Sequence, residues 1–139
     1  MTVLFPSFLI QCAPHMEAES PYKGQTGLRR LLSATRNSFE GFAAAVRHED
    51  AFRQELCLAV LLVPAGLWLG RDGLERALLV ATVLFVLVVE LLNSAVEATV
   101  DRISFDNHRL AKRAKDIGSA AVMLAIATAA AVWLLILIR

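Results

Sequence analysis

The sequence lacks the hallmarks of several common protein classes. Its 139 residues include only two cysteines, Cys12 and Cys57, with no disulfide framework or zinc spacing, so we interpret both as free thiols. The formal net charge of +1 indicates no general attraction to nucleic acid, and no nucleic-acid partner is expected. The phosphate-binding motifs G-x-x-x-x-G-K-[ST] and G-x-G-x-x-G are absent, which excludes the usual soluble kinase classes.

What the sequence has in excess is apolar residues, which make up 57% of the chain. This share is too high for an ordinary soluble domain, and long apolar runs predict an all-α membrane protein with three spans. We place the spans at about 54–70, 74–103 and 116–138. The apolar part of the first span, residues 56–69, is about 21 Å long and shorter than a bilayer core of about 30 Å. It therefore needs flanking residues, a thinned bilayer or shelter from protein.

Ahead of the spans, residues 1–25 predict a disordered tail and residues 26–139 a membrane domain. Pro6, Pro14 and Pro21 argue against a regular helix in the tail, and a weaker alternative is that Met16 is the natural start. From about 26 to 48, apolar residues recur at helical spacing and basic residues occupy other faces. This pattern predicts an amphipathic helix on the membrane surface; the alternative is an ordinary helix packed on protein.

Basic residues indicate the orientation of the spans. They concentrate before the first span and between the second and third, whereas the short first loop has only two beside two acids. The basic residues of the two rich segments are Arg29, Arg30, Arg36, Arg47, Arg53, Arg102, Arg109, Lys112, Arg113 and Lys115. The positive-inside rule then places the N-terminus and the second loop in the cytoplasm.

The second span carries a polar stripe. Its members recur at i, i+3, i+4, i+7 and i+11, so they share one face of a helix: Glu90, Asn93, Ser94, Glu97 and Asp101. An ionised carboxylate facing lipid is costly, so the stripe should face protein, water or a cation. It is either a functional site or a polar seam that holds an oligomer together.

The depth of the stripe favours a functional site at the lipid headgroups. About 13 apolar residues, or roughly 20 Å of helix, precede Glu90, which places it toward the cytoplasmic side. A path for ions across the membrane would need polar groups in the outer half as well, where only Thr82 occurs. Acids near this face suit Mg²⁺, and Lys115 suits phosphate oxygens. This arrangement suits a hydroxyl lipid that meets a soluble phosphoryl donor.

Three segments resemble the small bacterial diacylglycerol kinases. Glu49-Asp50-Ala51-Phe52-Arg53-Gln54-Glu55 is similar to their E-x-A-F-R-Q-E segment. Residues 89–102 are similar to V-E-x-L-N-S-A-x-E-x-x-V-D-R, and residues 113–121 to R-A-K-D-x-G-S-A-A. The resemblance covers about residues 26–139. The sequence departs from the family pattern at Arg36-Asn37 and at residues 105–107.

The resemblance implies a homotrimer in the bacterial inner membrane, with active sites between subunits at the cytoplasmic face. Each site would transfer the γ-phosphoryl group of ATP to the hydroxyl of diacylglycerol, with Mg²⁺ as cofactor. Glu90 and Asn93 would be catalytic, Glu90 as general base, while Glu49 and Glu97 would hold the metal. The implied ATP contacts are Arg30, Asn37, Glu49, Glu97, Asp106, Asn107, His108, Lys115 and Asp116. The implied lipid contacts are Ser38, Ala51, Phe52, Arg53, Gln54, Glu55, Trp68, Glu90 and Ser119.

Three other interpretations compete with this one. The nearest keeps the chemistry and replaces the lipid by undecaprenol. The others are a small ion or proton transporter and a structural membrane adaptor, in which the acids of the stripe only register subunits. In the adaptor, Glu90→Gln would change the stability of the oligomer and no reaction rate.

Overall fold

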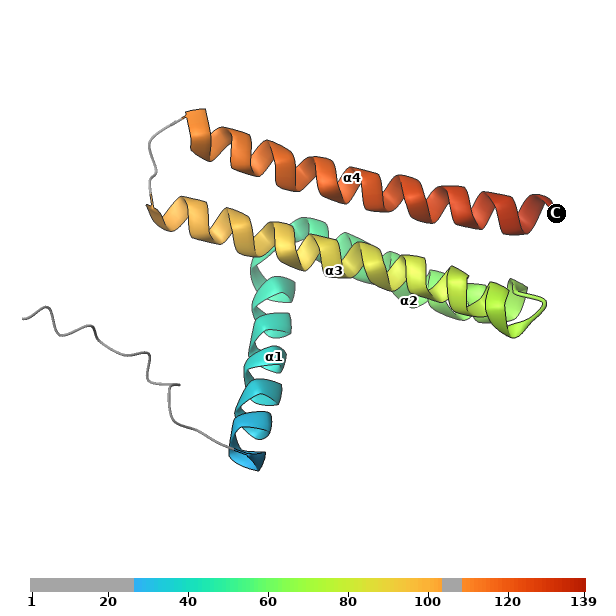
Figure 1. Ribbon diagram of the computed structural model, residues 1–139, viewed down its shortest axis with the longest axis horizontal. Helices are drawn as coiled ribbons and strands as arrows, with labels where there is room; N and C mark the ends of the chain where they lie inside the picture. Colours follow the sequence, from blue (N-terminus) through green and yellow to red (C-terminus); the bar gives the residue numbers. More distant parts are fainter. Residues whose placement is uncertain (1–26, 104–108) are drawn as a thin grey trace, which may run out of the picture. The chain divides into compact units, whose positions relative to one another are not determined.

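The computed structural model describes residues 27–103 and 109–139, and their regular structure is entirely α-helical. The helices are α1 (Leu28–His48), α2 (Asp50–Leu69), α3 (Gly73–Ile103) and α4 (Arg109–Ile138) (Figure 1). The prediction of an all-α fold is therefore confirmed. The predicted tail at 1–25 and residues 104–108 lie outside the described residues.

Three of these helices are long and apolar enough to cross a membrane, namely Asp50–Leu69, Gly73–Arg102 and Arg109–Ile138. At 1.5 Å per residue, their 20, 30 and 30 residues give lengths of about 30, 45 and 45 Å. All three reach the thickness of a bilayer core. α2 reaches this length because it begins at Asp50, so that about a turn and a half of largely polar helix precedes the short apolar stretch. The predicted number of helices that could span a membrane is confirmed for the described residues.

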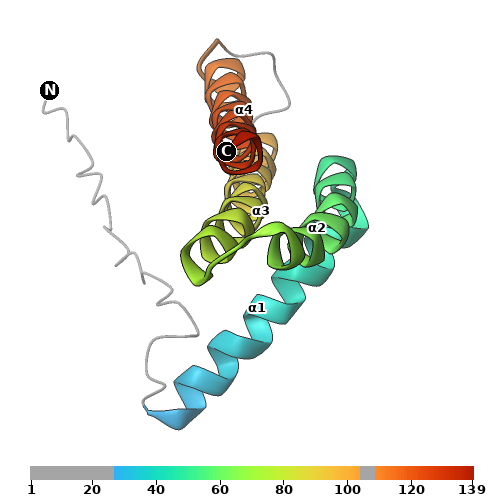
Figure 2. The same ribbon diagram turned by 90° about the vertical axis from the view of Figure 1, so that its right-hand side faces the viewer.

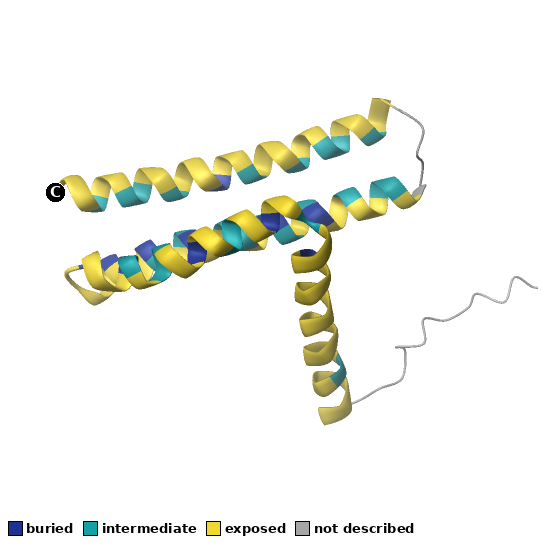
Figure 3. Cartoon of the chain, turned by 180° about the vertical axis from the view of Figure 1, so that it is seen from behind, coloured by how far each residue is buried: buried dark blue, intermediate teal, exposed yellow. Residues whose placement is uncertain are grey.

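The side chains on these three helices are mostly exposed (Figure 3). Large apolar residues such as Leu84 (48% exposed), Leu124 (67%) and Leu135 (74%) are among them. In water, so much apolar surface would favour association or aggregation, whereas lipid tails solvate it readily. The distribution is that of a membrane protein.

Where the three helices meet, α3 packs against both α2 and α4 (Figure 2). Leu79 of α3 is fully buried at this contact. Gly66 of α2 lies against it so closely that an added Cβ would be 3.0 Å from Leu79 Cβ. From α4, Trp133 Nε1 donates a hydrogen bond to the Leu79 carbonyl at 3.2 Å. A small residue and a half-buried indole thus bring all three helices together at one point.

The chain divides into two compact units, residues 1–35 and 36–139, and α1 runs through the boundary. In the first unit Leu28, Leu31 and Leu32 are 79%, 64% and 70% exposed. In the second, the Phe42 ring lies 6.4 Å from the ring of Phe52, which is only 1% exposed. The location of α1 on a membrane surface stays a prediction.

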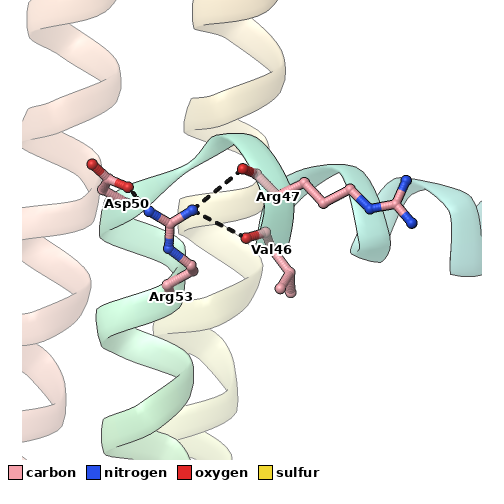
Figure 4. Close-up of polar contacts among 4 residues, drawn as sticks. All are labelled: Val46, Arg47, Asp50 and Arg53. Carbon is pink, nitrogen blue, oxygen red and sulfur yellow. Dashed lines mark hydrogen bonds and ion pairs between the residues drawn. The ribbon is translucent and has the colours of Figure 1, made fainter.

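The junction between α1 and α2 is a single extended residue, Glu49, with φ −112° and ψ 109°. Arg53 stabilises it, because its guanidinium donates to the carbonyls of Val46 and Arg47, each at 3.3 Å, and pairs with Asp50 (Figure 4). The last carbonyls of a helix have no partner within the helix, so these bonds satisfy the end of α1. Arg53 thereby fixes the turn that carries Glu49.

The turn between α2 and α3 is also held by hydrogen bonds between side chains and the backbone. Asp72 Oδ1 accepts from the Glu75 amide at 2.8 Å, and Glu75 Oε2 accepts from the Arg71 amide at 2.9 Å. This reciprocal arrangement resembles a capping box and starts α3. Glu75, only 9% exposed, also faces the Arg139 guanidinium at 3.6 Å.

Candidate active site

A cavity of about 420 Å³ lies between α2, α3 and α4. Because the three helices alternate in direction, the start of α2, the end of α3 and the start of α4 share one end of the bundle. The cavity is at this end and receives side chains from all three helices and from the junction before α2. Its lining residues are Glu49, Ala51, Glu55, Glu90, Asn93, Glu97, Ser119, Val122, Met123 and Ile126.

The polar stripe of α3 supplies the centre of this cavity. Glu90, Asn93 and Glu97 follow one another at i, i+3 and i+7, so they project from the same face of the helix. Glu90 is the most enclosed, with 4% of its surface exposed. Asn93 Nδ2 donates a hydrogen bond to Glu97 Oε1 at 3.2 Å, which fixes the amide relative to the carboxylate.

The other two members of the stripe face different surroundings. Ser94 lines a second cavity, of about 570 Å³, between residues 38–49 and α3. Asp101, one turn beyond Glu97, pairs with Lys115 of α4 at 2.6 Å. Both side chains of this pair are partly exposed, at 51% and 38%. An exposed pair contributes little stability, so Lys115 can exchange its partner for another anion at small cost.

Two side-chain atoms at the cavity lack hydrogen-bond partners. Glu55 Oε2 and Asn93 Oδ1 are both buried, and neither has a partner in the described part of the chain. Buried polar atoms are nearly always bonded, because leaving one unpaired costs about 1–3 kcal/mol. Two unpaired buried acceptors beside one cavity therefore need an explanation other than stability, and a functional role of the cavity is one.

The acids suit a cation that is held only partly by protein. Glu49 and Glu97, the predicted metal ligands, line the same cavity. Within residues 27–103 and 109–139, no three His, Cys, Asp or Glu side chains form a group that could enclose a metal ion. Mg²⁺ commonly takes one or two carboxylates and completes its shell with water and substrate phosphates. The donor set fits Mg²⁺ that arrives with a nucleotide.

The structure brings most of the predicted lipid contacts to this end of the bundle. Ala51, Glu55 and Ser119 line the 420 Å³ cavity, and Ser38 lines the 570 Å³ cavity. Phe52 is buried against Phe42, and Gln54 is exposed.

Trp68 lies apart from these residues. It is 83% exposed and sits 13 residues, or about 20 Å of helix, beyond Glu55 on α2. It does not line the 420 Å³ cavity, and its contact with lipid stays a prediction.

Fewer of the predicted ATP contacts can be placed. Asn37 on α1 and Asp116 at the start of α4 are exposed, and Lys115 is paired as described above. Arg30 belongs to the other compact unit and is an exposed residue of α1. Asp106, Asn107 and His108 lie outside the described residues.

Sequence reasoning missed the apolar wall of the cavity. Val122, Met123 and Ile126 follow Ser119 on α4 at spacings of three, four and seven. That helical spacing could have indicated that these residues share one face, but the uniform hydrophobicity of α4 made this face indistinguishable from the others. Below this wall, a small apolar cavity of about 140 Å³ shares Glu55 and Ile126 with the larger one. A polar chamber and an apolar one thus adjoin at Glu55 and Ile126.

The fold and the cavity together define an all-helical membrane protein with a carboxylate-lined site at one end of its spans. The family described as prokaryotic diacylglycerol kinase matches residues 36–137. This chain belongs to that family.

Individual proteins named diacylglycerol kinase are also similar to this chain in sequence. The chain is 53% identical over 119 residues to a diacylglycerol kinase of Pseudomonas aeruginosa, covering 86% of this chain and 97% of that protein. It is 46% identical over 112 residues to the diacylglycerol kinase of Escherichia coli K12, which covers 81% of this chain and 92% of that protein. It is 45% identical over 108 residues to the diacylglycerol kinase of Haemophilus influenzae, which covers 78% of this chain and 92% of that protein.

Proposed function

We propose that this chain transfers the γ-phosphoryl group of ATP to the free hydroxyl of diacylglycerol, giving phosphatidic acid and ADP. The observation that carries the proposal is the cavity in which buried Glu90 lies with Asn93 and Glu97, next to an apolar chamber that shares Glu55 and Ile126 with it. Membership in the prokaryotic diacylglycerol kinase family supports the same activity.

Glu90 is the general base in this proposal. Its carboxylate accepts the proton of the lipid hydroxyl as the oxygen attacks the γ-phosphorus. Its position supports the role, since it is the most buried acid of the cavity and is screened from bulk water. Phosphoryl transfer otherwise depends on positioning and charge neutralisation. Asn93, held by Glu97, presents its amide to the transferred group.

Glu49 and Glu97 hold the cation that accompanies ATP. When bound, Mg²⁺ neutralises the negative charge of the phosphates. Lys115 leaves Asp101 to contact the phosphate oxygens, which its partial exposure permits. Asp116 and the predicted contacts Arg30, Asn37, Asp106, Asn107 and His108 complete the nucleotide side in this proposal.

The lipid approaches from the apolar side. The 140 Å³ chamber is lined by leucine, valine, isoleucine and alanine side chains below Glu55, which suits an acyl chain. The unpaired Glu55 Oε2 is then an acceptor at the depth where glycerol oxygens and their hydroxyl would lie. Ser119 offers a further hydroxyl on the same wall.

We place the chain in the bacterial inner membrane, with the N-terminus and the second loop in the cytoplasm and α1 on the membrane surface. The distribution of basic residues supports this orientation. We propose a homotrimer as the assembly. The exposed small residues Ala120, Ala121 and Ala127 on α4 support close contact with another helix.

The test is transfer of ³²P from Mg-[γ-³²P]ATP in mixed micelles that offer diacylglycerol and undecaprenol side by side. Label in phosphatidic acid, lost in Glu90→Gln, is the expected result. Preferential label in undecaprenyl phosphate would overturn the choice of lipid. Absence of any lipid label from a well-folded preparation would overturn the kinase activity and favour a transporter or an adaptor.

A further inference from the structure

Gly118 of α4 lies directly against Asn93 of α3. A Cβ built on Gly118 would lie well inside contact distance of Asn93 Oδ1 and 3.3 Å from Asn93 Cγ. At Gly41 and Gly73, by contrast, an added Cβ would meet nothing within 4 Å. Gly66 and Gly70 are also closely approached, by Leu79 and Arg76, but Gly118 is the one among the described glycines that lies against a side chain of the 420 Å³ cavity.

The Asn93 amide is constrained on both sides. Its Nδ2 donates to Glu97 Oε1 at 3.2 Å, whereas its Oδ1 is buried without a hydrogen-bond partner in the described part of the chain. The reverse orientation of the amide would set its oxygen against a carboxylate, which can only accept. Glu97 therefore determines which end of the amide faces it, and the other end occupies the space left by the missing side chain of Gly118.

We propose that Gly118 is a positioning residue for phosphoryl transfer, because only glycine at this place leaves room for the Asn93 amide to keep its bond to Glu97. This inference rests on the role given to Asn93 in the proposed function. Gly118 is not among the residues that line the cavity, so it acts through Asn93 alone. The backbone of α4 at Gly118 in this way sets the orientation of the Asn93 amide.

Alanine at 118 should disturb the amide and leave the helix intact. The atom that a Cβ would meet first is the far end of a side chain, which can rotate away, and α4 itself forms more readily with alanine than with glycine. The rotated amide loses its bond to Glu97. Loss of a supporting contact of this kind typically lowers activity about 10–100-fold. We expect this loss in kcat, with the KM for diacylglycerol unchanged.

The test compares the full chain with Gly118→Ala, Asn93→Ala and the double variant in mixed micelles with MgATP, and uses Gly73→Ala as matched control. Gly118→Ala should lower kcat about 10–100-fold, and Gly73→Ala should not. In the Asn93→Ala background, Gly118→Ala should cost nothing further, because the Cβ then occupies the space of the missing amide. An unchanged kcat in Gly118→Ala, or an equal loss in both backgrounds, would overturn the inference.

The same set separates this inference from the proposed function. Normal activity of Asn93→Ala would remove the catalytic role of Asn93 and the inference with it. A damaged Asn93→Ala beside a normal Gly118→Ala would overturn the inference alone. As a readout other than activity, the side-chain amide signal of Asn93 in asparagine-labelled protein should shift in Gly118→Ala and stay in place in Gly73→Ala. An unshifted signal in Gly118→Ala would also overturn the inference.

Discussion

Replacing Glu90 with glutamine separates a catalytic from a structural role for the most buried acid of the cavity. Glu90 is 4% exposed and shares the cavity with Glu49, Glu55 and Glu97. Glutamine keeps the shape of the side chain and removes its charge from this acidic group. A structural seam would depend on that charge, whereas a catalytic base is held in place at a cost to stability.

The expected effects of Glu90→Gln on turnover and on the free energy of unfolding can both be estimated. Loss of a general base typically lowers turnover about 10²–10⁴-fold. Removing a buried charge from among like charges should leave the free energy of unfolding unchanged or raise it by about 1–3 kcal/mol. Activity and stability therefore move in opposite directions, or stability does not move at all.

The assay measures phosphatidic acid formation and the free energy of unfolding of the same preparation in detergent. Glu75→Gln is the matched control, because it changes a buried carboxylate on the same helix but away from the cavity. Glu75 accepts from the Arg71 amide at 2.9 Å and pairs with Arg139. The control should lose roughly 1 kcal/mol of stability and keep its turnover. Full turnover of Glu90→Gln, or joint loss of its turnover and its stability, would refute the reasoning.

Three further predictions follow from the structure. Phe52→Ala should lower the free energy of unfolding by about 3–5 kcal/mol, because Phe52 is 1% exposed, whereas Phe52→Leu should lose much less; thermal unfolding of both variants in detergent checks this. Lys115→Met should raise the KM for MgATP about tenfold and leave the KM for diacylglycerol unchanged, because Lys115 can exchange Asp101 for phosphate; steady-state kinetics with each substrate varied checks this. Removal of Mg²⁺ with a chelator should abolish turnover but leave the unfolding temperature of the nucleotide-free protein unchanged, since Glu49 and Glu97 supply only two carboxylates. The lipid kinase assay measures the turnover, and calorimetry with and without ATP measures the unfolding temperature.

Much of this architecture could be predicted from the sequence, because long apolar runs and helical periodicity are local properties. The number of spans followed from the runs. The convergence of Glu90, Asn93 and Glu97 followed from their spacing along one face. The position of Glu49 beside them needed more, since it depends on a sharp junction that Arg53 holds by bonding the end of α1.

Contacts between helices could not be predicted, because spacing does not determine how far each helix is rotated about its axis. The stripe was expected to be continuous, yet Ser94 faces a different cavity from its neighbour Asn93. The apolar wall around Met123 was missed for the same reason. In the sequence Gly118 was only the glycine of the segment 113–121, and its particular partner emerged from the packing of α4 on α3.

The two ends of the bundle differ in how well their polar groups are satisfied. At the α2–α3 turn, Glu75 accepts from one amide and its own amide donates to Asp72. At the opposite end, the buried side-chain atoms without partners among the described residues are Glu55 Oε2, Asn93 Oδ1 and Ser94 Oγ. Each belongs to a residue that lines one of the cavities at that end. Unpaired buried groups cost stability, so a sequence that satisfies the polar groups at one end and not at the other gives up stability at the end where the candidate site lies.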